Sequence, residues 1–490
     1  MSSCDAPTWG DAHETAQNLL QSMEEMREAS FAVVRRGIEL LRLLEEGMGP
    51  SLKSKAMQAL RQRITHLEDL QGLYKEQALL LAVTGVMKAG KSTTINALVG
   101  MEVLPTRNMP MTAVPTRIKH RDSVVTPLLQ IPNVKIWQDA LRQLRPHLLE
   151  SLRQNPDTVL QPVLRRIAVW DYIPRTMEGC EPVRETLSKL HDIVSWCDEL
   201  GIAFPYNAFK KLEALPLVEV AFSHWPEAAV LPPEITLLDT PGGNEAGGRG
   251  FKTLALHWLT EANGLLLITD YTQLKSEAEE ELYENIASLP TNEGKRVYIL
   301  VNRFDQQTSA SLNAPSVCSF VYGRASRLQP LLVHTTAAQL AQLADKASTA
   351  LSQDGHLPVD QEKWVSDFGE KAFGRRWEKD ITDVALLRRA IAALHKDSGM
   401  EGFFSKMILL DRLATRMPQE VIKACHQVLM FLINTAEHLD IHEDTPEPLK
   451  KFVKNEVSFL KTEGTRFIRA IDVFIRLRAQ VLGEKTPLEA

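Results

Sequence analysis

The chain has 490 residues, of which 44% are hydrophobic and 24% are charged, and its formal net charge is −6. At roughly 150 residues per domain this length predicts two to four domains, and the composition excludes disordered tails, collagen-like chains and small disulfide scaffolds. The negative charge also excludes attraction of the whole chain to nucleic acid or anionic membranes, so any such contact needs a local basic patch.

The cysteines and the hydropathy of the chain indicate in which cellular compartment the protein is expected. The cysteines lack CxxC or metal-finger spacing, and their odd number fits a reducing cytoplasm better than a disulfide framework. The chain has no stretch of about 18 uncharged apolar residues and no secretory signal at its start. We therefore expect a cytoplasmic protein without a transmembrane segment. The five cysteines are Cys4, Cys180, Cys197, Cys318 and Cys425.

Residues 1–77 carry apolar side chains three and four positions apart among Glu and Arg, a spacing typical of amphipathic helices. Gly47, Gly49 and Pro50 interrupt the pattern, so we expect a hairpin of two helices. The same spacing is compatible with an intermolecular coiled coil, but packing of these helices on their own protein is the favoured interpretation.

An α/β pattern replaces the helical one from Leu79 onward. A continuous apolar run over 79–83 ends in Gly85 and precedes a short helical stretch, which is how an α/β domain begins. Helical patterns around 253–261 and 276–288 alternate with further apolar runs, which predicts a mainly parallel sheet with helices on both faces. These further strands are expected at 217–222, 235–238, 265–268, 297–301 and 331–334.

A long segment, about residues 121–214, separates the first strands and is rich in Leu, Arg and Pro. We predict that it is a helical insertion of its own shape within an α/β domain of residues 78–345, and we assign it no task. Beyond this domain the apolar spacing is helical to the end of the sequence, and Pro446 and Pro448 interrupt it between the last two helical segments. Residues 346–490 are therefore expected to form a helical segment.

A phosphate-binding motif, GxxxxGK[ST], occupies residues 85–92 as GVMKAGKS, between the first strand and its helix. Its glycines let backbone N–H groups surround a β-phosphate at a helix N-terminus. Lys91 is expected to reach the β- and γ-phosphates and Ser92 to bind Mg²⁺. A Gly/Lys turn without function is the alternative, and the strand–helix context disfavours it. The expected nucleotide contacts are Gly85, Lys88, Ala89, Gly90, Lys91, Ser92 and Thr93.

The base is expected to be read by NRFD, residues 302–305, which directly follow the strand at 297–301. This segment matches the guanine-reading pattern NKxD except for Arg at the second place. Asp305 can accept hydrogen bonds from the guanine N1–H and N2–H₂, which adenine cannot supply, so the motif predicts GTP. Asn302 would tie this loop to the phosphate loop, and the stem or the guanidinium of Arg303 would cover the base face.

Contacts to Mg²⁺ and the γ-phosphate are expected from two more segments. DTPG, residues 239–242, follows an apolar strand, which places Asp239 to hold Mg²⁺ through water and Gly242 to turn its N–H toward the γ-phosphate. The first switch region is expected at 104–112, where Thr112 is our choice for the hydroxyl that completes the Mg²⁺ shell. The competing threonines are Thr106 and Thr116.

Four segments are similar, together with NRFD, to the dynamin superfamily: GVMKAGKSTTINALVG, LPTRNMPMTAVPT, LLDTPGGNEAG and DYTQLKS. Within this superfamily the chain most resembles bacterial members that are linked to nucleoid positioning and to the replication clamp. The similarity continues through AFGRRW, residues 372–377, to about Leu432. It implies a GTPase head, a helical neck from both chain ends and a helical stalk that assembles homodimers or homo-oligomers. The stalk would be short, and residues 17–20 match a clamp-binding pentapeptide poorly.

The catalytic machinery lacks the glutamine of many signalling GTPases, because GNE follows DTPG at residues 243–245. In dynamin relatives the third variable residue of the phosphate loop has this role, and here it is Lys88. We hypothesise that its ammonium neutralises charge on the β–γ bridge. A solvent-facing lysine is the alternative interpretation. Arg107 and Arg249 are alternative arginine fingers, in cis or across a dimer.

Residues 447–482 interleave Lys and Arg with Phe and Ile. This pattern fits a basic amphipathic helix for anionic lipid or DNA, although a solvated stalk helix is the favoured alternative. The leading hypothesis is a dynamin-like GTPase that hydrolyses GTP to GDP and phosphate and couples dimerisation or assembly to movement of a helical stalk. The competing hypothesis is a slow GTP-dependent switch or adaptor for nucleoid or replication partners, without membrane remodelling.

Overall fold

The structure is a computed structural model that divides the chain into two compact units. Every element described below belongs to the unit of residues 78–227 and 234–407. The hairpin predicted over 1–77 and the basic segment 447–482 lie outside the described residues, apart from single positions. The structure describes residues 79–106, 114–154, 167–223, 235–241, 249–289, 295–308, 312–359 and 362–400, with single positions at 62, 65, 403, 406, 407, 455, 458 and 462.

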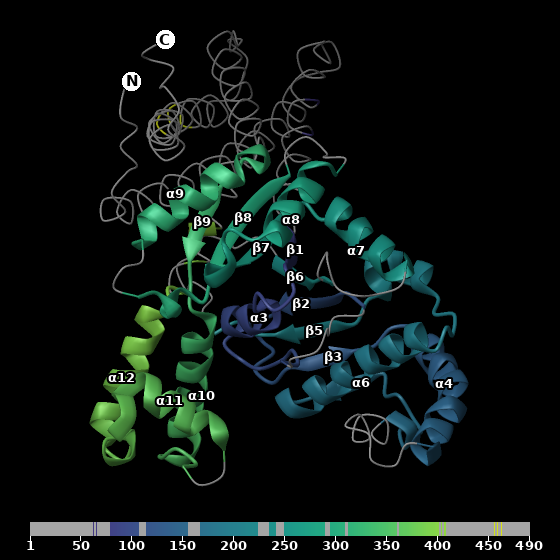
Figure 1. The fold of residues 1–490 in the computed structure, drawn as a ribbon, viewed down its shortest axis with the longest axis horizontal. Helices are drawn as coiled ribbons and strands as arrows, with labels where there is room; N and C mark the ends of the chain where they lie inside the picture. Colours follow the sequence, from purple (N-terminus) through teal and green to yellow (C-terminus); the bar gives the residue numbers. More distant parts are fainter. Residues whose placement is uncertain are drawn as a thin grey trace, which may run out of the picture. The chain divides into compact units, whose positions relative to one another are not determined.

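One nine-stranded sheet, in the order β4-β3-β5-β2-β6-β1-β7-β8-β9, organises this unit (Figure 1). Strand β1 pairs in parallel with β6 and β7, and β8 and β9 continue the parallel series. Strand β2 is antiparallel to β6 but parallel to β5, and β3 is antiparallel to β4 and β5. The strands are β1 (Leu79–Gly85), β2 (Thr116–His120), β3 (Leu128–Gln130), β4 (Thr176–Glu178), β5 (Leu217–Val220), β6 (Ile235–Asp239), β7 (Gly264–Asp270), β8 (Arg296–Asn302) and β9 (Leu332–Thr335).

The central strands are the apolar runs from which the sheet is predicted. All residues of β7 are buried, as are all residues of β8 after Arg296. Strands covered by helices on both faces need no polar side, so they have continuous apolar sequences. The predicted α/β fold with a mainly parallel sheet is confirmed. The flanking helices are α3 (Lys91–Val99), α7 (Arg249–Glu261), α8 (Glu277–Ala287) and α9 (Ala314–Arg324).

The segment 121–214 contains helices, as predicted, and also extends the sheet. Its strands β3 and β4 join the sheet edge beside β5, and Trp137 packs on Phe204 and Phe209 with ring centroids 5.5 and 5.2 Å away. Three-residue strands show no usable hydrophobic alternation, which is why the sequence pattern does not reveal them. The helical pieces are α4 (Val134–Gln154), α6 (Cys180–Glu199), η2 (Tyr206–Lys210) and η3 (Leu212–Ala214).

Three helices beyond the sheet form a small bundle, drawn in green in Figure 1. They share an apolar core that includes Leu343, Phe368 and Ile391, and α10 also packs against α3, the helix after the phosphate loop. Helix α10 runs across position 345, where the sequence places the end of the α/β domain; that division of the chain stays a prediction. The helices are α10 (Ala338–Asp354), α11 (Lys363–Phe373) and α12 (Val384–Asp397), with the short turns η4 (Tyr271–Gln273), η5 (Phe304–Gln306), η6 (Ser326–Leu328) and η7 (Gly374–Lys379).

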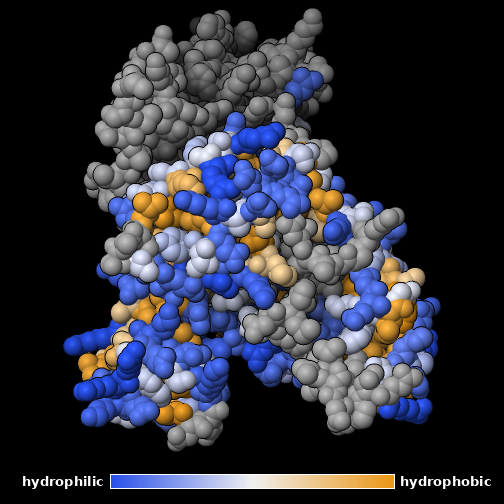
Figure 2. Space-filling view, in the orientation of Figure 1, coloured by the Kyte–Doolittle hydropathy of each residue, from blue (hydrophilic) through white to orange (hydrophobic). Residues whose placement is uncertain are grey.

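Polar residues predominate on the one face of the described part that Figure 2 shows. Figure 2 shows hydrophilic residues over most of the visible face, with apolar residues in separate patches. Among the described residues, none of the helices combines the length and the apolar character needed to cross a bilayer.

Candidate functional site

The phosphate-loop glycines are required by close neighbours. A Cβ atom on Gly85, the last residue of β1, would lie 2.3 Å from the carbonyl oxygen of Ile268 in β7. Gly90 has a φ of +89°, and a Cβ atom there would lie 2.4 Å from Asn302 Nδ2. Packing alone excludes a side chain at Gly85, whereas Gly90 is required by its backbone conformation as well as by the Asn302 amide beside it.

The cradle for a phosphate group is built at the start of α3. Lys91 is the first residue of this helix, and its buried side chain donates from Nζ to the Gly85 carbonyl at 3.4 Å. Ser92 and Thr93 follow, both half-buried. The first N–H groups of a helix have no partner within it and favour an anion, and the first turn of α3 has no acidic residue. These features suit a bound phosphate.

Asn302 fastens the NRFD loop to the phosphate loop. It is the last residue of β8, and its Nδ2 donates to the Ala89 carbonyl at 2.9 Å. Its Oδ1 accepts from the Ala338 N–H at the start of α10, at 3.0 Å. One buried amide therefore joins the phosphate loop, the central sheet and the helical bundle.

Arg303 provides a second link between the two loops. Its Nη2 donates to the Lys88 carbonyl at 2.7 Å, and its Nη1 lies 2.8 Å from Asp270 Oδ2. Both Arg303 and Lys88 have a positive φ, of 62° and 64°, a conformation uncommon for residues other than glycine. The guanidinium is thus held on the phosphate loop, and the two expected ways of covering a base face, by the stem or by the guanidinium of Arg303, both stay predictions.

Asp270, which pairs with this guanidinium, lies beside a second carboxyl group, that of Glu279. Asp270 ends β7 and also accepts from the N–H and hydroxyl of Thr272, at 2.8 and 2.7 Å. Glu279 accepts from the Asp270 N–H at 3.1 Å. Burial, with the Asp270 charge adding to it, raises the pKa of Glu279 to about 7. Glu279 is therefore partly neutral near pH 7, which lowers the repulsion between the two carboxyl groups.

Asp305, the expected base reader, lies on η5 beside a residue that the motifs do not include. Its Oδ2 is 2.7 Å from the Nζ of Lys371, in α11. The Asp305 side chain is 11% exposed and that of Lys371 is 42% exposed. No sequence signal could connect them, because they are 66 positions apart and belong to different layers of the fold.

Strand pairing places Asp239 beside the end of β1, the strand that leads into the phosphate loop. Asp239 ends β6 opposite Val83 of β1, and it is buried. The Val83 carbonyl accepts from the N–H and the hydroxyl of Thr240, at 3.2 and 2.8 Å. Of the competing threonines, Thr116 begins β2 opposite Asp239 and is buried, whereas Thr106 is exposed. Outside the described residues lie Arg107, Thr112, Gly242 and the side chain of Arg249.

The donors present fit a magnesium ion that is shared with a nucleotide. Mg²⁺ prefers oxygen ligands and is usually held by one or two side chains together with phosphates and water. Ser92, in the first turn of α3, and Asp239, at the end of β6, offer such oxygens. Within the described ranges there is no group of three or more His, Cys, Asp or Glu residues that could hold a metal by itself.

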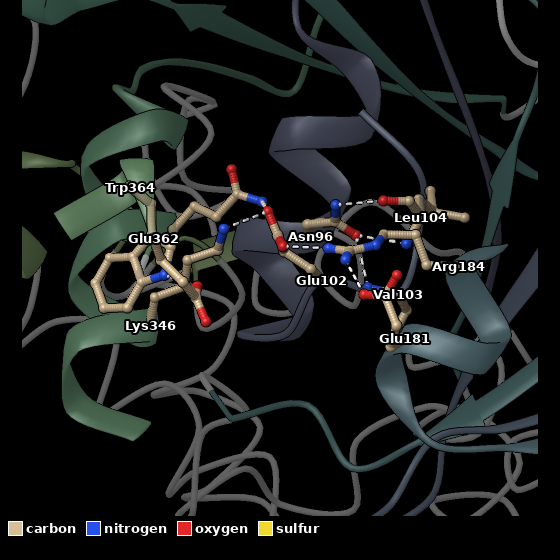
Figure 3. A network of polar contacts seen from close by, with 10 residues as sticks. Asn96, Glu102, Val103, Leu104, Glu181, Arg184, Lys346, Glu362 and Trp364 are labelled. Atoms are coloured by element: carbon tan, nitrogen blue, oxygen red, sulfur yellow. Dashed lines mark hydrogen bonds and ion pairs between the residues drawn. The ribbon is translucent and has the colours of Figure 1, made fainter. Parts of the chain in front are cut away.

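A network around Glu102 connects the segment after α3 to two other parts of the unit. Figure 3 shows its carboxylate between Arg184 of α6 and Lys346 of α10. Arg184 Nη1 lies 2.5 Å from Oε2, while Gln342 Nε2 and Lys346 Nζ lie 2.6 and 2.9 Å from Oε1. Asn96 of α3 bonds both the N–H and the carbonyl of Leu104, at 2.8 and 2.9 Å. Glu102 therefore ties the segment after α3 to the insertion and to the bundle, and Asn96 holds the start of the predicted first switch, Leu104, on α3.

Replacing Glu102 by glutamine should destabilise this unit by about 2 kcal/mol, because two cations lose a partly buried counter-charge. The free energy of unfolding, from urea titration at low salt, measures this. Asp139→Asn is the control, since Asp139 pairs with Arg142 on an exposed helix face, and it should change stability by no more than about 0.5 kcal/mol. Equal effects of the two substitutions would contradict a structural role for the network.

A guanine-motif loop that is hydrogen-bonded to the carbonyls of a phosphate loop, at the end of parallel strands, defines a nucleotide-binding domain of the P-loop GTPase class. Comparison with protein families agrees, since residues 81–304 match the model of the Dynamin family. The matched part of the chain is a dynamin-type GTPase domain, as its motifs indicate.

Known proteins similar to this chain include two named Clamp-binding protein CrfC, from Escherichia coli and from its strain K12. Both are 35% identical over 377 residues, which cover 74% of this chain and 50% of the relative. The chain thus spans about half the length of the curated relatives it matches.

Solved structures similar to this chain include two chains of an oligomerised bacterial dynamin pair, described as a mechanism for long-range sensing and tethering of membranes. The first is 18% identical with a TM-score of 0.34, covering 93% of this chain and 69% of that one. The second is 15% identical with a TM-score of 0.32, covering 94% and 76%.

Proposed function

We propose that the protein binds GTP with Mg²⁺, hydrolyses it to GDP and phosphate, and couples dimerisation or assembly to movement of its helical segments. The observation that carries this proposal is the double link between the two loops. Asn302 bonds the Ala89 carbonyl and Arg303 bonds the Lys88 carbonyl. The loop that presents Asp305 is thereby set at a fixed place relative to the phosphate cradle, which suits a ligand with both a guanine base and phosphates.

The residues around the cradle have complementary roles in this proposal. Lys91 contacts the β- and γ-phosphates, and Ser92 binds Mg²⁺ with Asp239 acting through water. Thr112 completes the metal shell, and the Gly242 N–H contacts the γ-phosphate. When bound, Mg²⁺ supplies positive charge to the phosphate oxygens.

Lys88 is proposed as the residue that stabilises charge during hydrolysis. Its side chain is exposed at the tip of the phosphate loop, and its backbone is held by the Arg303 guanidinium at the carbonyl oxygen. A fixed backbone limits the positions that its ammonium can reach, and preorganised charge is a large source of rate enhancement.

A second candidate function is a slow GTP-dependent switch or adaptor. The 35% identity to proteins named for clamp binding favours it, with the nucleoid or the replication clamp as the partner. In both candidates the protein works in the cytoplasm, at the nucleoid or at a membrane surface, and it forms homodimers or homo-oligomers through its GTPase domain and stalk.

Turnover across a protein dilution series, with and without liposomes, tests the two candidates. For the assembling GTPase, GTP turnover per molecule should rise steeply with protein concentration or on adding lipid, because neighbouring molecules complete the active conformation. A flat, slow rate, together with a partner that binds only the GTP form, would support the switch. Lys91→Ala is the control for contaminating activity, and a wild type no faster than this control would refute hydrolysis.

A further inference from the structure

The base-reading carboxylate already has a partner within the chain. Lys371 donates from Nζ to Oδ2 of Asp305 at 2.7 Å. Lys371 belongs to α11, whose neighbours Val365 and Phe368 are part of the bundle core. The ammonium therefore comes from a different layer of the fold and is set opposite Asp305 by the packing of the bundle.

The chemistry of guanine recognition conflicts with this ion pair. Guanine presents two donors side by side, N1–H and N2–H₂, and a carboxylate reads them best with one oxygen for each. Here one of the two oxygens accepts from an ammonium, and the Asp305 side chain is only 11% exposed. Each carboxylate oxygen can accept a second hydrogen bond, but a side chain so nearly covered leaves little room for a base beside the ammonium. A base that engages both oxygens is therefore expected to displace the lysine.

Displacement of the lysine costs little, because its side chain is 42% exposed. An ammonium at such a place is readily hydrated once it leaves its partner, and ion pairs with one exposed member contribute modestly to stability. The Asp305 carboxylate, in contrast, is nearly covered and needs donors in both states. It exchanges the ammonium for the base, so its hydrogen bonding is satisfied with and without nucleotide.

We propose that Lys371 is an affinity-determining residue of the base site: its ammonium pairs with Asp305 Oδ2 and competes with guanine for that oxygen. This inference rests on the proposed function, since it takes Asp305 as the base reader. Lys371 weakens the binding of GTP and GDP alike, because both carry the same base.

The test is the dissociation constant of GDP, measured by calorimetry on the full chain for the wild type and for Lys371→Gln. Removal of the competitor should tighten GDP binding about threefold, and the difference should shrink as salt screens the ion pair. Lys371→Arg keeps the positive charge and should stay near the wild type. Lys363→Gln, an exposed lysine on the same helix, should bind GDP as the wild type does.

A double-mutant comparison isolates the pair. The second pair of proteins carries Asp305→Asn, and xanthosine diphosphate is the nucleotide measured. In this background Lys371→Gln should change the dissociation constant of xanthosine diphosphate by less than about 1.5-fold, because the Lys371 ammonium no longer has a carboxylate to pair with. Unchanged or weaker GDP binding by Lys371→Gln would overturn the inference alone. A wild type that binds no GDP would overturn the proposed function and this inference with it.

Discussion

Replacing Lys88 with alanine should lower stimulated GTP turnover by about 10²–10³-fold, the usual effect of removing one preorganised charge from a phosphoryl-transfer site. GTP affinity should stay within about threefold of the wild type, because Lys91 and the loop N–H groups are the proposed phosphate contacts both before and during the reaction. The Lys88 carbonyl that accepts from Arg303 is retained by alanine, so the link between the loops is kept. The turnover number at saturating GTP, with the dissociation constant, separates the two effects.

Lys396→Ala, which removes an exposed lysine at the end of α12, is the matched control and should leave turnover unchanged. Turnover of Lys88→Ala close to the wild-type value would contradict a catalytic role and would identify Lys88 as a solvent-facing lysine. Arg107 and Arg249 would then be the next residues to replace.

Replacing Asp305 with asparagine should weaken GDP binding by about 10³-fold or more, because a site built to accept two N–H groups then presents one acceptor and one donor. Xanthine has a carbonyl in place of the guanine amino group, so the asparagine amide can donate to it. Xanthosine diphosphate should therefore bind the variant better than it binds the wild type. Calorimetric dissociation constants for both nucleotides on both proteins give the complete comparison.

Asp354→Asn serves as the control, since Asp354 ends α10 with an exposed side chain, and neither nucleotide should distinguish it from the wild type. If Asp305→Asn bound GDP as well as the wild type does, Asp305 would not be the base reader. Thermal unfolding of each variant, measured alongside, shows whether the fold is kept.

The parts of the fold that the sequence predicts are those with a strong local pattern. The long buried strands β1, β7 and β8 are unbroken apolar runs, and such runs in alternation with helices indicate a parallel sheet. Strands β2, β3 and β4 are short, with polar residues in each. Their place in the sheet depends on antiparallel pairing with distant strands, which no local pattern encodes.

The sequence by itself determined the phosphate loop, because strand, loop and helix are contiguous and glycine alone fits the backbone at Gly90. It also predicted a guanine-reading loop after β8. Only the tertiary structure decided that the Arg303 guanidinium holds the phosphate loop and that Lys371 covers Asp305. Partners so far apart in the chain are chosen by how the sheet and the bundle pack, and their long, charged side chains are compatible with many other neighbours until that packing is known.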